Sequence, residues 1–92
     1  METPFALGTA EALRRLAQRR DPEAWTVLVE RHGGEIFAVA RQILRDEGLA
    51  EDATQEALLL VRDHAGQFKP PEAEADTAAR GWLLKLACNA AL

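Results

Sequence analysis

Ala50-Glu51-Asp52-Ala53-Thr54-Gln55-Glu56-Ala57-Leu58-Leu59-Leu60-Val61 is the stretch of this chain that says most about its fold. Positions 53, 57 and 61, joined by 54, 58 and 65, recur at the period of an α-helix and form a stripe that we expect to face a core. The opposite side carries Asp52, Gln55, Glu56 and Asp63, with Leu59 among them. A large apolar side chain framed by acids and an amide is more typical of a docking surface than of a solvated face.

The composition favours helices along the whole chain. Hydrophobic residues make up 48% of the 92 residues, with two Trp, three Phe and no Tyr. Many of the apolar residues are Ala and Leu, which are strong helix formers, whereas the β-branched residues that favour strands are few. A chain of this length forms one domain with a single modest core. We therefore predict that residues 1–92 are one all-α domain, a compact bundle of four to five helices.

Helix boundaries can be placed from capping and breaking residues. A first helix is expected over 9–20, with Thr9 as its N-cap, and Asp21-Pro22 restarts the chain as N-cap and first helical residue. Gly33-Gly34 should end or kink this second helix, because glycine weakens a helix interior. The period then resumes from Ile36 to about Asp46, and Gly48 separates it from the helix that contains Ala50–Val61.

The C-terminal third contains one loop and one further helix. Residues 67–76 include Pro70-Pro71 and should form a loop, after which Asp76 or Thr77 can cap the last helix. The amphipathic stripe of that helix is Ala79, Trp82, Leu83, Leu86, Ala87 and Ala90. The chain stops at Leu92 with no Gly, Pro or basic last turn. We therefore expect it to be a fragment of a longer two-domain protein.

Charge and cysteine usage narrow the class of protein. The net charge is −4, with Arg14, Arg15, Arg19 and Arg20 near the start and mostly acids across 46–63. An acidic segment favours a basic partner surface and argues against autonomous binding to duplex DNA. The chain has a single Cys, its start (Met1–Pro4) lacks the basic and apolar pattern of a secretory signal, and it contains no long apolar run. These features predict a cytoplasmic protein without a membrane-spanning segment.

The sequence offers no catalytic or cofactor site. His32 and His64 lack metal-ligand spacing to a second His or Cys, so neither a metal nor another cofactor is expected. Cys88 has no evident neighbouring base. We therefore expect a binding protein rather than an enzyme.

Several landmarks stand in one order along the chain and carry a family resemblance. They are Asp21-Pro22-Glu23-Ala24-Trp25, Arg31-His32, Ala50-Glu51-Asp52-x-x-Gln55-Glu56-x-Leu58, Phe68-x-Pro70 and Gly81-Trp82-Leu83-Leu84-x-Leu86-Ala87-x-Asn89. The series resembles region 2 of the bacterial extracytoplasmic-function (ECF) RNA polymerase sigma factors. The resemblance covers residues 21–91 and leaves 1–20 as an added N-terminal helix.

The resemblance implies a transcription initiation domain that docks on the clamp helices of the RNA polymerase β′ subunit. Asp52, Gln55 and Glu56 occupy the positions where the family meets the polymerase, and we expect Leu59 and Arg62 to belong to the same polymerase-binding face. Carboxylates and an amide suit an Arg-rich helix through charge-assisted hydrogen bonds, and Leu59 would supply a desolvated apolar centre. An anti-sigma factor is a further partner that the resemblance allows.

The resemblance also implies that the domain helps to recognise and melt the promoter −10 element, which becomes partly single-stranded. Phe68 and Asn89 match positions near the pocket for an extruded base, where a ring can stack and a carboxamide can pair. Lys69, Arg80 and Lys85 are the nearby cations available for phosphates.

Departures from the family and simpler interpretations leave alternatives open. Arg62 stands where the family often has an aromatic residue, Cys88 where it is often basic, and the long loop carries Glu72, Glu74 and Asp76, which would repel phosphate. A sigma-like protein-interaction module without promoter recognition is therefore the alternative function.

Simpler roles are also open for several single residues. Trp82 fits a core anchor better than a stacking platform. Phe68 can equally close the end of the bundle, Asn89 can bond locally, and the four arginines of 14–20 fit a solvated face.

Overall fold

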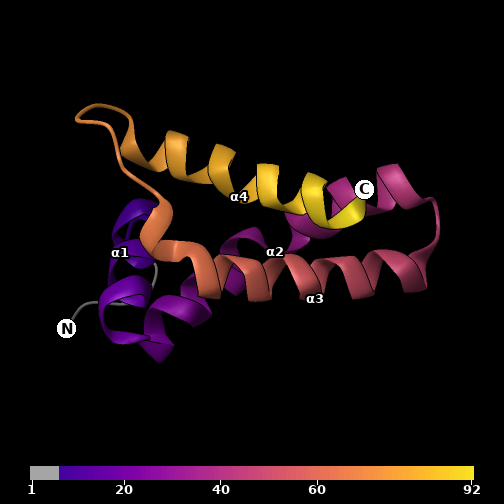
Figure 1. Ribbon diagram of the computed structural model, residues 1–92, viewed down its shortest axis with the longest axis horizontal. Coiled ribbons are helices and arrows are strands. Elements are labelled where there is room, and N and C mark those ends of the chain that lie inside the picture. Colours follow the sequence, from indigo (N-terminus) through magenta and orange to yellow (C-terminus); the bar gives the residue numbers. More distant parts are fainter. Residues whose placement is uncertain (1–6) are drawn as a thin grey trace.

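The computed structural model describes residues 7–92 as a bundle of α-helices (Figure 1). The elements are α1 (Thr9–Arg19), α2 (Pro22–Leu44), α3 (Glu47–His64), the short 3-10 helix η2 (Ala65–Gln67) and α4 (Ala75–Ala91). The predicted all-α bundle is confirmed, because every regular element within this range is helical. Met1–Pro4, which lack the pattern of a secretory signal, lie outside the described residues.

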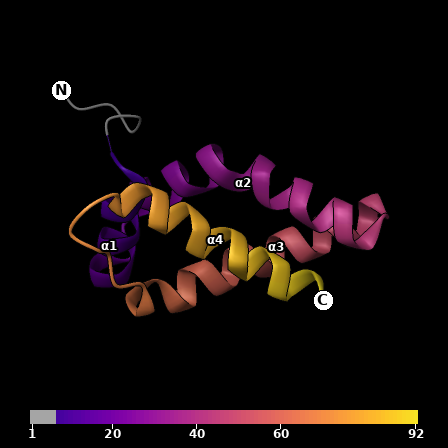
Figure 2. The same cartoon turned by 90° about the horizontal axis from the view of Figure 1, so that it is seen from above.

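Three of the helices run along the long axis of the molecule, and the fourth closes one end. The dimensions are 40 × 26 × 19 Å. Helices α2, α3 and α4 pack against one another along the longest dimension, while α1 lies at the end where η2 and the loop lead into α4 (Figures 1 and 2). Across residues 7–92, no helix combines the length and the apolar character needed to cross a membrane.

The core has a larger half beside α1 and an alanine-rich half toward the α2–α3 turn. Leu13, Leu16, Leu28, Val61 and Leu83 are the large buried side chains of the first half. The second half is built around Ala40, Ala50, Ala53 and Ala91, with Ile36, Ala57 and Ala87 between the two. Alanines at these positions let α2, α3 and α4 approach closely. The small inner side chains of α3 therefore hold this helix against its neighbours and leave its opposite face directed outward.

The predicted start of the second helix agrees with the structure, whereas α3 begins earlier than expected. The Asp21 carboxylate accepts a hydrogen bond of 2.9 Å from the Glu23 backbone N–H, and Pro22 is the first helical residue. Asp46 caps α3 by accepting from the Leu49 N–H at 2.8 Å. Because α3 begins at Glu47, Gly48 lies within its first turn and does not separate the helices as expected.

The expected end of a helix at Gly33-Gly34 is wrong, because α2 continues without interruption from Pro22 to Leu44 (Figure 2). Neither glycine has a positive φ, and a Cβ added at either one would contact nothing within 4 Å. Buried residues on both sides of the pair, Leu28 and Ile36 among them, anchor the helix to the core. This packing outweighs the roughly 1 kcal/mol that each glycine costs in a helix interior.

Two expected N-caps are also wrong. Gly8, not Thr9, is the N-cap of α1, and the buried Thr9 hydroxyl contacts His32 instead. Neither Asp76 nor Thr77 caps α4, which follows Glu74 in a left-handed conformation without a side-chain cap. Asp76 Oδ1 instead accepts a 2.9 Å hydrogen bond from the Ala10 backbone N–H. A carboxylate from α4 thus satisfies a free donor at the start of α1.

Candidate functional site

Helix α3 has two sharply different faces. Ala53, Ala57 and Val61 are buried, as the predicted stripe requires, and Ala65 continues the burial into η2. On the opposite side Asp52, Gln55 and Glu56 are exposed, and Leu59 retains 46% of its surface exposure. The inner stripe fixes the rotation of α3 about its axis, because turning the helix would expose the alanines and bury the acids.

The polar residues of the outer face have no internal partners. Within residues 7–92, the side chains of Asp52, Gln55 and Glu56 make no hydrogen bond or ion pair with the rest of the chain. Arg62 differs, since its Nε donates to Asp63 Oδ1 at 3.2 Å. The outer face therefore offers free carboxylate and amide groups beside an exposed leucine, with one cation already partly neutralised.

Leu49 belongs to the same surface and was missed by the sequence reasoning. It is 54% exposed and lies three residues before Asp52 and seven before Glu56, so the three share one side of the helix. That spacing was the signal that could have found it. Leu49 and Leu59 place an apolar side chain on each side of the Asp52–Glu56 turns.

Phe68 and Lys69 follow η2 at the α1 end of the bundle. The Phe68 ring is half-buried, and its centroid lies 5.8 Å from that of Trp82 at an interplanar angle of 50°. Both rings pack against the larger half of the core. Lys69 is exposed, and its Nζ lies 3.5 Å from the Gly66 carbonyl oxygen. The structure therefore brings Phe68 to Trp82 and leaves part of each ring accessible.

Arg80 points to α2. Its Nε donates to Glu35 Oε2 at 2.6 Å, and its Nη2 forms an ion pair with the same oxygen. Arg80 is the main reason that the pKa of Glu35 is lowered, and Glu35 in turn raises the pKa of Arg80. A guanidinium already bonded to a carboxylate attracts phosphate less strongly than a free one.

Lys85 and Asn89 form a separate pair on α4. Both are exposed, and their four-residue spacing places them on one side of the helix. Arg80 is five residues before Lys85, which puts it on a different side. The predicted DNA contacts are thus divided between the Phe68–Lys69 segment, the Lys85–Asn89 pair and the Arg80–Glu35 ion pair. Cys88 is half-buried.

Glu35 also joins a chain of polar contacts, buried at Thr9 and His32, that the sequence did not reveal. His32 is 4% exposed, with Nδ1 at 3.0 Å from Glu35 Oε1 and Nε2 at 2.9 Å from Thr9 Oγ1. Because a carboxylate only accepts, Nδ1 donates to Glu35. Thr9 Oγ1 also accepts from Arg31 Nη1 at 3.4 Å, which leaves its O–H to donate to His32 Nε2. The chain Thr9–His32–Glu35–Arg80 links α1, α2 and α4.

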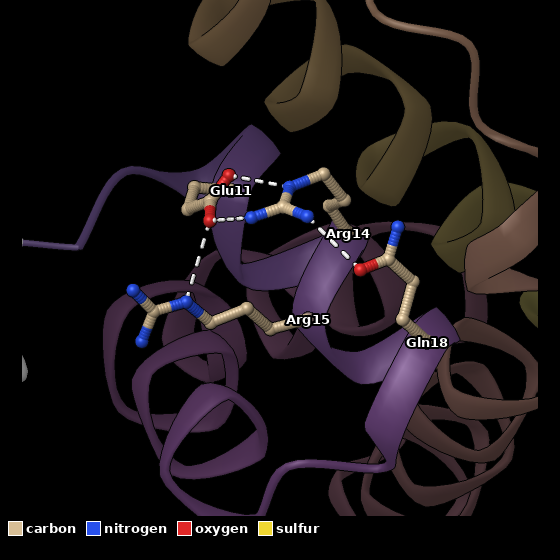
Figure 3. Close-up of polar contacts among 4 residues, drawn as sticks. All are labelled: Glu11, Arg14, Arg15 and Gln18. Atoms are coloured by element: carbon tan, nitrogen blue, oxygen red, sulfur yellow. Dashed lines mark hydrogen bonds and ion pairs between the residues drawn. The ribbon is translucent and has the colours of Figure 1, made fainter.

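Two arginines of α1, Arg14 and Arg15, are held by side chains of their own helix. Glu11 bonds to Arg14 and Arg15, and Arg14 Nη1 also donates to Gln18 Oε1 at 2.9 Å (Figure 3). The hydrogen bond from Arg14 is the main cause that lowers the pKa of Glu11 to about 2. Among residues 7–92, no cluster of His, Cys, Asp or Glu is suited to holding a metal ion.

Comparison with known proteins places this arrangement in one family. Residues 28–92 match Sigma-70 region 2, and the chain belongs to that family. It is 31% identical over 84 residues to the ECF RNA polymerase sigma factor SigK of Mycobacterium sp. strain KMS, covering 91% of this chain and 42% of that protein. The SigK of Mycolicibacterium vanbaalenii is 30% identical over 84 residues, covering 91% and 41% of the two chains. The chain thus spans about two fifths of these relatives, and no solved structure matches it.

Proposed function

We propose that this domain docks on the β′ clamp helices of RNA polymerase core through the outer face of α3. The observation that carries the proposal is the pairing of free polar groups on Asp52, Gln55 and Glu56 with the exposed Leu59. Polar side chains without internal partners keep their full capacity for charge-assisted bonds to arginine. Leu59, and Leu49 at one end, supply apolar area that docking removes from water.

The same domain, in this proposal, helps to recognise and melt the promoter −10 element as an alternative sigma factor. Phe68, Lys69, Lys85 and Asn89 supply an aromatic ring, two cations and a carboxamide at or near the surface. Single-stranded DNA is held by this combination of stacking and phosphate contacts. Arg80 contributes less while Glu35 holds it.

The docking proposal is tested by titrating a fragment that contains the β′ clamp helices with the 92-residue chain. Gln55→Ala, Glu56→Arg and Leu59→Ala should each weaken binding. Glu23→Arg is the matched control, because Glu23 is an exposed acid in the first turn of α2. If all three α3 variants bind as tightly as the unaltered chain, the docking face is wrongly assigned.

A second candidate function is a sigma-like interaction module that docks on or sequesters another regulator without recognising a promoter. The ion pair between Arg80 and Glu35 favours it, as do Glu72 and Glu74 in the loop before α4. Binding to a fluorescent single-stranded −10 oligonucleotide at low and moderate salt separates the two candidates. Specific, salt-sensitive binding supports the sigma function, while clamp-helix binding alone supports the interaction module.

A further inference from the structure

A groove of about 320 Å³ lies between α1, η2 and the start of the loop that leads to α4. Phe68 and Lys69 line one side, and Arg14, Ala17 and Gln18 of α1 line the other. No described residue of α4 lines it, so it is separate from the Lys85–Asn89 pair. Helix α1 lies outside the stretch that matches Sigma-70 region 2. Nothing in the family assignment therefore gives these three α1 residues a role.

The groups around the groove favour an anionic ligand with a flat ring. Lys69 and Arg14, whose charge is partly neutralised by Glu11, stand among short or apolar side chains, and Phe68 adds an aromatic surface. The Gln18 carbonyl oxygen accepts from Arg14, whereas its amide group donates to no residue in the described range. An aromatic ring, a free amide donor and neighbouring cations are the groups that proteins use to hold unpaired nucleotides.

The α1 side of the groove is already ordered. Arg14 is bonded at Nε to Glu11 Oε2 over 2.8 Å and at Nη1 to Gln18 over 2.9 Å, as Figure 3 shows. These contacts fix the guanidinium and orient the Gln18 carboxamide, whose nitrogen points away from Arg14. A side chain ordered before binding loses less conformational entropy when the ligand arrives.

We propose that this groove binds one unpaired nucleotide of single-stranded DNA. Gln18 donates to the edge of the base, Phe68 contacts the base and Lys69 contacts a neighbouring phosphate, while Arg14, which Glu11 holds, orients the Gln18 carboxamide. At about 320 Å³ the groove holds less than one turn of a peptide helix, which is about 5.4 Å long and about 10 Å wide, so a small planar group such as one nucleotide suits it better. The inference rests on the proposed function, because it requires the domain to bind single-stranded promoter DNA, and it extends that binding face onto α1.

The test measures fluorescence anisotropy of a labelled single-stranded −10 oligonucleotide with the full 92-residue chain. Gln18→Ala should weaken binding about three- to tenfold, as expected for one lost hydrogen bond, and Arg14→Ala by no more than this, because Arg14 acts by orienting Gln18. Arg19→Ala is the matched control, because it removes the same charge from an exposed position on α1 outside the groove. It should change affinity less than about twofold, as expected for an exposed charge that makes no direct contact.

Two further measurements separate a built site from general attraction by charge. Ala17→Leu fills the groove without altering charge, and Ala17 is exposed, so the variant should fold and bind DNA more weakly. In a series of oligonucleotides with single abasic sites, removal of one particular base should weaken binding by the unaltered chain. The same removal should have no further effect on Gln18→Ala, because that contact is already lost.

The outcomes distinguish this inference from the function on which it rests. If the unaltered chain binds the oligonucleotide but Gln18→Ala and Ala17→Leu bind it equally well, the groove does not hold a nucleotide and the promoter function stands. If these variants weaken only clamp-helix binding, the groove belongs to a protein partner and the inference is overturned. If the unaltered chain binds no single-stranded DNA, both the promoter function and the nucleotide site in the groove are refuted.

Discussion

Thr9→Val should destabilise the domain although it changes neither the size nor the branching of the side chain. Thr9 and His32 are each 4% exposed, and Thr9 Oγ1 lies 2.9 Å from His32 Nε2. Valine cannot donate a hydrogen bond, so a buried ring nitrogen is left without a partner, at a cost of about 1–3 kcal/mol. For a domain of this size each kcal/mol lowers the Tm by roughly 4–8 °C. We expect the lower part of that energy range, because Thr9 begins α1 and water can reach a loosened helix start.

Thermal and urea unfolding followed by circular dichroism measure this effect. Thr9→Ser is the control, because it keeps the hydroxyl and should retain most of the stability. In a double-mutant cycle with His32→Leu, the part of the loss caused by the unsatisfied imidazole should disappear, and only the part caused by the long 3.4 Å contact from Arg31 Nη1 to Thr9 Oγ1 should remain. A Thr9→Val chain within about 0.5 kcal/mol of the unaltered one, the range typical of surface changes, would refute the reasoning.

Three further predictions concern helix α2 and the ion pairs. Gly34→Ala should raise the free energy of unfolding by about 0.5–1 kcal/mol, because the added Cβ meets no atom within 4 Å; a lower Tm would contradict the continuous α2. Glu11 has a pKa lowered to about 2 from 4.5, so its contribution to stability is complete above about pH 4.5 and is lost as the pH falls through about 2. The fall in Tm between pH 5 and pH 3 should therefore be smaller for Glu11→Gln than for the unaltered chain. The difference should be small because the pair is largely exposed, and an equal fall in Tm for both chains would contradict this. Glu35→Gln should release Arg80 and steepen the salt dependence of single-stranded DNA binding by about 0.7 per added phosphate contact. An equal change in Glu23→Gln would show that only net charge matters.

Hydrophobic periodicity and capping residues predicted the parts of the fold that depend on residues close together in the sequence. The period of Ala53, Ala57 and Val61 identified the buried stripe of α3, and Asp21-Pro22 marked the start of α2. The same signals failed at Gly33-Gly34, because the anchoring contacts of α2 come from other helices. Local propensity is a weak guide where packing on both sides of a break holds the helix together.

Long-range contacts could not be predicted from the sequence. Thr9 and His32 are 23 residues apart, Glu35 and Arg80 are 45 apart, and Asp76 reaches Ala10 across 66. Thr9 and Asp76 each had a plausible local role as an N-cap, which concealed their distant partners. The proposed polymerase face was visible because all its residues lie on one helix. The groove was not, because it forms only where α1 meets the segment after η2.

The most direct test of the account is the affinity of the chain for the β′ clamp-helix fragment when Leu59 is shortened to alanine. Complete burial of a leucine contributes about 1.5–3 kcal/mol, and Leu59 is 46% exposed. Docking that covers it therefore gains about 1 kcal/mol, or roughly fivefold in Kd. Leu59→Ala should weaken binding by about this factor in a chain that circular dichroism shows to be folded at the assay temperature, while Leu92→Ala, at a leucine that is 88% exposed, should have no effect. Equal affinities for Leu59→Ala and the unaltered chain would contradict docking through α3.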